Sequence, residues 1–165
     1  MNLKNFLRTA AAMILACGAT TANAAIFLQV PGVAGESTAK DYKDWIIVQA
    51  MSIGVIQRAC TGVQLAKPLD RSSPALSAAA ITGQLFPSMT MAVTSSTGDG
   101  SLEYLNLVLT NVVVSSVQVG ATASGPPSEQ VSLLPGVITM VYRQQLGDGR
   151  LGSPVESTFT CAKYK

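Results

Sequence analysis

The stretch that most constrains the fold is EYLNLVLTNVVVSSVQV, residues 103–119, the longest β-like run in the chain. Successive side chains of a strand point to opposite faces of the sheet, and in this run both faces carry apolar residues. A sheet with one face in water alternates apolar with polar residues, so this run predicts a strand covered on both sides. The cover must come from an opposing sheet together with a helix or a neighbouring subunit.

One short helix is predicted within KPLDRSSPALSAAAITG, residues 67–83. Ser73 is the expected N-cap, Pro74 the first helical residue, and Gly83 the left-handed residue that ends the helix. An apolar stripe of small residues follows at helical spacing: Leu76, Ala79, Ala80 and Gly83. About nine residues are too few for a helix that is stable alone in water, so this helix must dock on the sheet.

The rest of the chain consists of short β-like runs separated by turn formers, with one predicted loop at Gly120–Ser128. The further predicted strands are 26–30, 45–57 with a bulge at Gly54, 89–94, 129–134, 137–144 and 155–162. Trp45, the only tryptophan, is interpreted as a packing residue. Many short strands, one helix and no repeats predict a mainly β fold, a barrel or sandwich with the helix packed outside.

The first 24 residues resemble a signal peptide rather than part of a folded domain. Lys4 and Arg8 are followed by an apolar run from Ala10 to Ala19 and by the small-residue cleavage pattern Ala22-Asn23-Ala24. The apolar run is about half the length that spans a bilayer. We therefore expect residues 1–24 to be cleaved and residues 25–165 to form a single domain. An uncleaved anchor and lipid attachment at Cys17 are the alternatives.

Removal of the signal peptide changes the charge and the cysteine count. The mature chain has 165 − 24 = 141 residues, and its net charge is (11 − 2) − 9 = 0. A neutral chain without a basic stripe does not suggest a nucleic-acid partner, and no later stretch suggests stable membrane insertion. Cys60 and Cys161 remain, and two cysteines in an exported chain predict a disulfide. Two buried free thiols are the alternative.

No catalytic, cofactor-binding or metal site is predicted. The chain contains no histidine, which is the usual general base and the commonest metal ligand. It also lacks a nucleophile elbow, a Walker loop and a dinucleotide-binding glycine pattern. The carboxylates of Glu36, Asp41, Asp44 and Glu103 are expected on the solvated surface. These absences predict an exported binding or structural protein rather than an enzyme.

The order of the sequence motifs resembles that of a known family. FLQVPGVAGEST, KDW before a strand ending GVIQ, KPLDRSSPAL, EYLNLVLTNVVVSS and EQVSLLPGVITMVYR follow one another over most of residues 25–143. In this order they are similar to the haemolysin-coregulated protein (Hcp) family of type VI secretion. The resemblance implies a two-sheet Hcp-like β-barrel with one short external helix. It also implies a homo-hexameric ring that stacks into the inner tube of the secretion machine and carries effectors in its lumen.

The resemblance also implies which residues act. The excursion between the first two strands corresponds to the family's extended loop, which helps one ring contact the next. The loop residues are Gly35, Glu36, Ser37, Thr38, Lys40 and Asp41. Ser77 lies opposite the helix's apolar stripe and is predicted to face the lumen. The expected partners are other copies of the chain, secretion-system components and effector cargo.

Two features depart from the family pattern. Members normally carry no cleavable signal, whereas this chain is expected in the periplasm or outside the cell. The end FTCAKYK also contributes Cys161, where the family usually has no cysteine. Two functions follow from the sequence: a ring-forming tube or carrier protein, or a stand-alone exported binding protein that kept the Hcp barrel without forming the tube.

Overall fold

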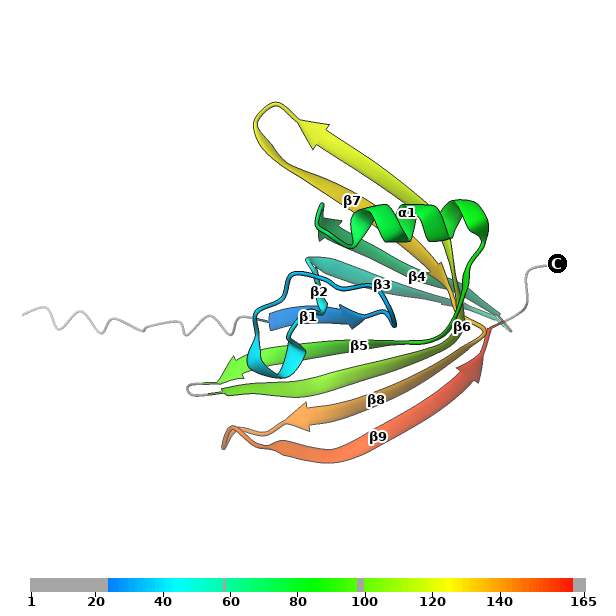
Figure 1. Cartoon of the computed structure of the whole chain (residues 1–165). Coiled ribbons are helices and arrows are strands. Elements are labelled where there is room, and N and C mark those ends of the chain that lie inside the picture. The colour runs from blue at the N-terminus through cyan, green and yellow to red at the C-terminus, as the bar shows by residue number, and fades with distance from the viewer. Residues whose placement is uncertain (1–23, 58, 98–99, 162–165) are drawn as a thin grey trace, which may run out of the picture.

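A computed structural model describes residues 24–57, 59–97 and 100–161 (Figure 1). The elements are β1 (Ala24–Gln29), the 3-10 helix η1 (Lys40–Tyr42), β2 (Ile46–Val48), β3 (Ala50–Ile56), β4 (Ala59–Pro68), α1 (Ser73–Thr82), β5 (Leu85–Thr97), β6 (Gly100–Thr122), β7 (Gly125–Leu134), β8 (Val137–Gln145) and β9 (Leu151–Thr160). The predicted signal peptide lies outside the described residues, except for Ala24 at the start of β1.

The long strand β6 belongs to both layers of the sheet. Its first half pairs with β5 and β8, and its second half pairs with β7. The register with β7 shifts between Val114 and Ser116, where the strand passes from one layer to the other. One layer is therefore β2-β1-β5-β6-β8-β9 and the other is β6-β7-β4-β3, all with antiparallel pairing (Figure 1). The strand predicted at 103–119 is confirmed, and it is longer than expected.

The two layers also meet at the chain segment that holds β2 and β3. β2 pairs with β1, and β3 pairs with β4. Between them, the amide of Gln49 donates to the carbonyl of Ala66 on β4. The single strand predicted for 45–57 is therefore wrong, because the segment changes its partner strand at Gln49. The mainly β, two-layer fold with one helix is confirmed, although among the described residues no strand ladder closes the sheet all the way round.

The core lies between the two layers. It is formed mainly by Leu28, Ile46, Val63, Leu65, Leu76, Met89, Met91, Leu107, Leu109, Val131, Leu133 and Ile138. A second, smaller cluster lies on the outer face of β1 and β5, where Phe27 and Ala92 are covered by Tyr42. Trp45 packs edge-on against Tyr42, as expected of a packing residue. Part of the outer apolar face of the first layer, on β1 and β5, is thus covered within the chain by residues 31–45.

The helix begins one residue earlier than predicted. Its N-cap is Ser72, and the amide of Leu76 donates to the Ser72 carbonyl. The expected N-cap, Ser73, is wrong because its hydroxyl instead accepts bonds from the Asp70 amide and the Lys67 ammonium. Gly83 ends the helix in the left-handed conformation with φ of 65°, as predicted. The helix docks on the sheet through its apolar stripe, as predicted, with Leu76 and Ala79 buried in the core.

Several strand boundaries differ from the predictions. The sequence did not indicate β4, and the predicted loop Gly120–Ser128 is largely a hairpin in which β6 and β7 continue to Thr122 and from Gly125. β9 begins at Leu151 and ends at Thr160, instead of spanning 155–162. Hydrogen bonds to neighbouring strands thus extend strands into polar segments that show little β pattern of their own. The bulge at Gly54 is confirmed by a register shift between Gly54 and Val55.

Candidate assembly surfaces and the charge cluster beneath the helix

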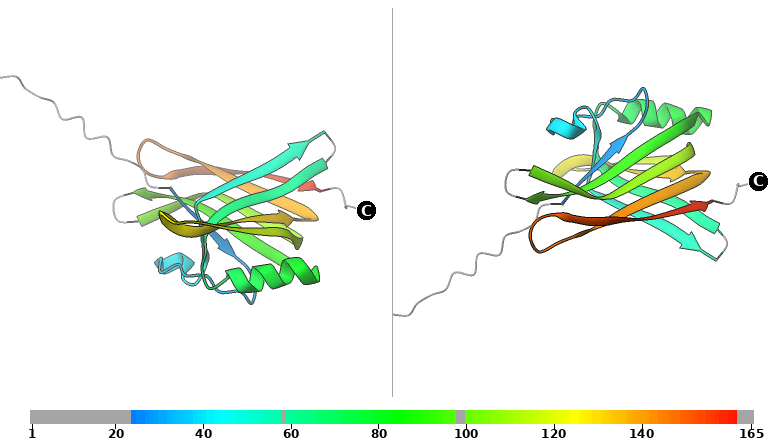
Figure 2. Two further views of the ribbon diagram at one scale, coloured as in Figure 1. Left: turned by 90° about the horizontal axis from the view of Figure 1, so that it is seen from above. Right: turned by 90° about the horizontal axis from the view of Figure 1, so that it is seen from below.

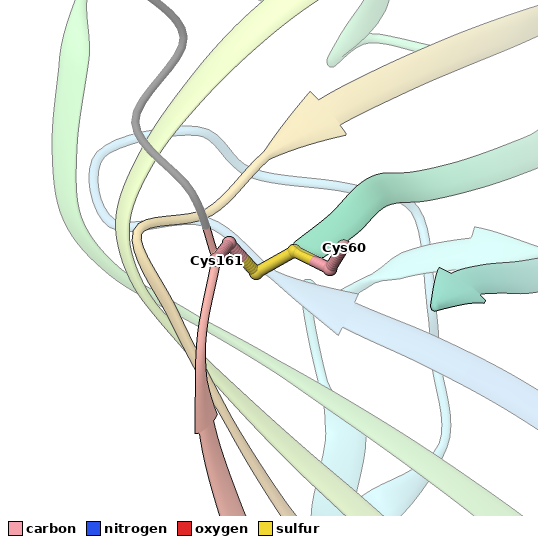
Figure 3. The surroundings of a disulfide bond; sticks show 2 residues. All are labelled: Cys60 and Cys161. Atoms are coloured by element: carbon pink, nitrogen blue, oxygen red, sulfur yellow. A yellow bond between two sulfur atoms is a disulfide. The ribbon is translucent and has the colours of Figure 1, made fainter. Parts of the chain in front are cut away.

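A disulfide joins the start of β4 to the end of β9 (Figure 3). Cys60 and Cys161 are both buried, with Cα atoms 5.0 Å apart and 101 residues between them in sequence. β4 pairs with β7, and β9 pairs with β8, in each case on the side away from β6. The disulfide therefore connects two strands end to end, and it fixes the C-terminal hairpin to the second layer of the sheet.

The excursion between β1 and β2 folds back on the segment that leads into β2. The amide of Gly35 donates to the Asp44 carbonyl, the amide of Asp44 to the Ser37 carbonyl, and the amide of Ser37 to the Trp45 carbonyl. A Cβ on Gly35 would overlap the backbone of Trp45 and Ile46, so only glycine allows this close approach. Beneath it, the rings of Phe27 and Tyr42 stack with centroids 4.5 Å apart.

Arg71 ties this excursion to the segment that precedes α1. Its side-chain Nε donates to the carbonyl of Gly35, and Nη2 pairs with the Asp44 carboxylate at 2.6 Å. Its backbone amide donates to the Glu36 carboxylate at 3.1 Å. The excursion and α1 lie on the same flank of the sheet in both views of Figure 2. The predicted ring-contacting loop is therefore a preformed structure with its own internal hydrogen bonds.

The predicted loop residues divide into two groups. Gly35 and Ser37 are buried and hold the excursion together. Glu36, Thr38, Lys40 and Asp41 are exposed and available for contacts outside the chain. A shallow groove of about 350 Å³ lies beside them, lined by Glu36, Ser37, Thr38, Lys43, Asp44 and Arg71.

Two carboxylates that were expected on the solvated surface have side-chain partners. Asp44 pairs with Arg71, while Glu103 accepts from the Tyr42 hydroxyl at 2.8 Å and from the Asn106 amide at 2.8 Å. Burial, together with the bond and the charge of Glu103, raises the pKa of Tyr42. The phenol therefore stays protonated and remains a hydrogen-bond donor.

Ser77 is half-buried in the single chain. Its neighbours Ala75, Ala78 and Ile81 are exposed and form the outer face of α1, with Ile81 88% exposed. Ser77 therefore lies at the border between the buried and exposed faces, rather than opposite the apolar stripe as predicted.

A buried charge cluster lies beneath the N-terminus of α1. The Lys67 ammonium is fully buried and contacts the carboxylates of Glu129 at 2.6 Å and Asp70 at 2.8 Å. It also donates to the Pro68 carbonyl and the Ser73 hydroxyl. Burial by itself would raise the pKa of Asp70, but hydrogen bonds from Lys67 and Ser72 and the charge of Lys67 outweigh it and lower that pKa.

Sequence reasoning missed this cluster and the role of Arg71. Lys67 and Asp70 are close together on the chain, but the second carboxylate partner of Lys67, Glu129, lies 62 residues away, and no local pattern marks that pair. The signal that was present is the segment KPLDRSS, in which three charged residues directly precede a helix start.

Residues 24–57, 59–97 and 100–161 contain no group of three or more histidine, cysteine or carboxylate side chains placed to hold a metal ion. Within the same residues, no helix has the length and apolar character needed to span a bilayer.

Comparison with known proteins gives consistent matches. A family model described as "Type VI secretion system effector, Hcp" matches residues 27–142. The protein hcp1 of Pseudomonas aeruginosa is 28% identical over 147 residues, which cover 79% of this chain and 91% of that protein.

Two solved structures show the likeness in fold. The Hcp1 structure from Salmonella typhimurium has a TM-score of 0.75 at 24% identity, covering 83% of this chain and 94% of that one. A structure titled "Structure of a type six secretion system protein" has a TM-score of 0.78 at 24% identity, covering 84% and 96%. At this level of identity, the two structures establish the fold alone.

Proposed function

The chain belongs to the Hcp family of type VI secretion proteins, and we propose on that premise that its 25–165 domain assembles into a closed ring of six copies. The family match runs from β1 into β8 and so covers both layers of the fold rather than one motif. This single observation carries the functional conclusion, a structural tube protein of type VI secretion. The alternative of a stand-alone exported binding protein is not favoured.

The distribution of apolar side chains supports self-assembly. Large exposed apolar residues in the described part of the chain are Ile47, Val55, Ile56, Leu69, Ile81, Leu85, Val119, Tyr142, Leu146 and Val155. Neighbouring exposed apolar residues, such as Tyr142 and its cross-strand partner Val155, mark interaction surfaces on small proteins. A head-to-tail contact between two different sides of the subunit would cover part of this apolar surface, and it yields a ring when the rotation closes.

The excursion at Gly35–Asp41 is proposed as the contact between stacked rings. Its backbone bonds and the Arg71 contacts support this, because a preformed loop loses little conformational entropy on docking. Glu36, Thr38, Lys40 and Asp41 are the exposed side chains that would meet the next ring. Ser77 at the border of the exposed face of α1 is proposed to contact effector cargo in the lumen.

Residues 1–24 are proposed to act as a cleaved signal peptide, which places the ring in the periplasm or outside the cell. Cleavage after Ala24 would remove only the first residue of β1, whose side chain is exposed. The disulfide supports this compartment, because disulfides persist in oxidising surroundings.

The test is the mass of the mature protein in solution. Size-exclusion chromatography with light scattering at tens of micromolar is expected to give six times the subunit mass, and negative-stain images are expected to show rings. A strictly monomeric mass at that concentration would reject the ring. If neither the wild-type rings nor the Asp41→Lys rings stack, only the proposed role of the excursion in stacking is rejected.

A further inference from the structure

One row of core-facing side chains crosses the first layer of the sheet and becomes more exposed to solvent from strand to strand. Leu105 of β6 lies between Val93 of β5 and Tyr142 of β8, and Tyr142 lies opposite Val155 of β9. Val93 is 6% exposed, Leu105 is partly buried, Tyr142 is 46% exposed and Val155 is 68% exposed. Burial thus falls steadily along one row towards β9.

The outer end of this row belongs to the core face and not to the solvent face. Residues that are even numbers apart on a strand share a face, so Tyr142 shares its face with Ile138. Ile138 is fully buried, and its cross-strand partner Phe159 packs against the core. Glu156, on the opposite face, is exposed and charged. The Tyr142–Val155 pair therefore lies on the same face of the sheet as the core residues, at a place where the core no longer covers that face.

β8 and β9 form the outer edge of the first layer of the sheet (Figure 1). Within the described residues, β9 has one ladder partner, β8, and most of residues 142–158 are exposed. From Arg143 to Gln145 the described ladders pair β8 with β9 alone, and a two-stranded ribbon with both faces in water is marginally stable. We propose that a second copy of this chain covers the Tyr142–Val155 face, so that this face forms one side of the ring interface. The proposal rests on the proposed function and identifies the surface that performs it.

Three observations favour a second copy as the occupant. The pair is apolar and aromatic, which suits a surface like the subunit's own core. The mature chain has a net charge of zero, (11 − 2) − 9, so copies carry no net charge to repel one another. The ribbon of β6 and β7, on the opposite side of the molecule in Figure 1, exposes Val119, so one chain offers apolar surface on both sides, as a head-to-tail contact requires.

The contact is made by the face of the ribbon and not by the free edge of β9. Pro154 lacks an amide donor, and Glu156 is an exposed charge on the edge strand. Both features discourage edge-to-edge pairing with another strand. The Tyr142–Val155 face carries neither feature.

The test compares Val155→Lys with the matched control Ile81→Lys, which places the same charge at an exposed apolar position on α1. Val155→Lys is expected to lose the ring and run as a monomer or small oligomer in light scattering, with an unchanged circular dichroism spectrum. Ile81→Lys is expected to keep the wild-type mass. The milder Val155→Ala is expected to raise the concentration of half-dissociation about tenfold, the effect of losing two buried methyl groups.

The outcomes separate the inference from the function. A ring of wild-type mass in Val155→Lys would overturn the inference and leave the proposed function intact. Loss of the ring in Ile81→Lys alone, or equally in both variants, would also overturn it. A monomeric wild-type protein would reject the proposed function first. Slower hydrogen exchange of residues 151–160 in the ring than in the dissociated protein would support the assignment.

Discussion

At the scale of single residues, Lys67 stands out because its charged side chain is buried. It is a fully buried cation held by two carboxylates, a backbone carbonyl and a serine hydroxyl. Such a cluster contributes little net stability relative to apolar residues, but removal of one partner leaves a buried charge uncompensated. Because β4, β7 and the start of α1 all contribute to it, the cluster also fixes how these three elements meet.

Lys67→Met is therefore expected to destabilise the domain by roughly 3–5 kcal/mol, because Glu129 and Asp70 lose their buried counter-ion. Urea unfolding followed by circular dichroism measures the change. Arg150→Met is the control, since it removes the exposed pair with Asp148 and should cost less than about 1 kcal/mol. Lys67→Met/Glu129→Leu should recover much of the loss. Equal effects of Lys67→Met and Arg150→Met would contradict this account.

Asp70 makes the stability of the domain depend on pH. Its pKa in the folded chain lies below its unfolded value, so its contribution is present above the unfolded pKa of about 3.9. That contribution is lost as the pH falls through the lower folded pKa. Thermal unfolding between pH 6 and pH 2 should therefore show a drop in acid that is smaller in Asp70→Asn. An identical pH profile in the two proteins would argue against the Lys67–Asp70 bond.

The disulfide closes a loop of 101 residues in sequence separation. In the chain-entropy model, a loop of this length contributes roughly 4–5 kcal/mol as an upper value. Cys60→Ser/Cys161→Ser is expected to unfold at lower urea, and the wild type under reducing conditions should shift to the same midpoint. Peptide mass spectrometry without reduction checks the bond itself. Two freely alkylating thiols in the native exported protein would refute it.

At the scale of elements, the excursion of residues 31–45 shows how a polar segment becomes ordered. Three kinds of contact stabilise it: backbone hydrogen bonds, the Phe27–Tyr42 stack and the hydrogen bonds of Arg71. The close approach of backbones at Gly35 is the tightest of these contacts. The close approach of the two backbones therefore requires glycine at position 35.

Gly35→Ala is expected to release the excursion, because the added Cβ would overlap the backbone of Trp45 and Ile46. Overpacking of this kind typically costs about 1–3 kcal/mol. Hydrogen exchange of residues 35–45 should quicken while β5 and β6 stay protected. Gly120→Ala is the matched control, because a Cβ there meets no atom within 4 Å. Unchanged exchange in Gly35→Ala would mean that the backbone can shift to accept the methyl group.

At the scale of the whole molecule, the disulfide and the proposed ring together imply an order of events. Under the proposed export, Cys60 and Cys161 would be oxidised after leaving the cytoplasm, and they are buried once the sheet has folded. Oxidation would therefore accompany folding of the subunit, and the proposed ring would assemble from subunits with the C-terminal hairpin in place.

Cleavage after Ala24 is the corresponding prediction. N-terminal sequencing of the protein recovered outside the cytoplasm should begin at Ala25, and Ala22→Asp/Ala24→Asp should accumulate uncleaved precursor because the cleavage site requires small residues. A Cys17→Ser variant that is exported and processed identically would exclude lipid attachment. Intact Met1 on exported protein would reject cleavage.

The sequence by itself determined the local and compositional features. Apolar residues on both faces predict the covered strand β6, Gly83 predicts the helix end, and Gly54 predicts the bulge, because each depends on residues close together in the chain. The order of the sequence motifs was sufficient to predict the family, which the family model confirms.

The tertiary structure alone decided the features that join distant segments. Glu129 reaches Lys67 only after β7 pairs with β4, and Arg71 reaches Gly35 only after α1 docks beside the excursion. Tyr142 and Val155 lie on the core face by pattern, yet their exposure follows from where the opposite layer ends. Such contacts depend on the packing of whole elements, and no local periodicity records them.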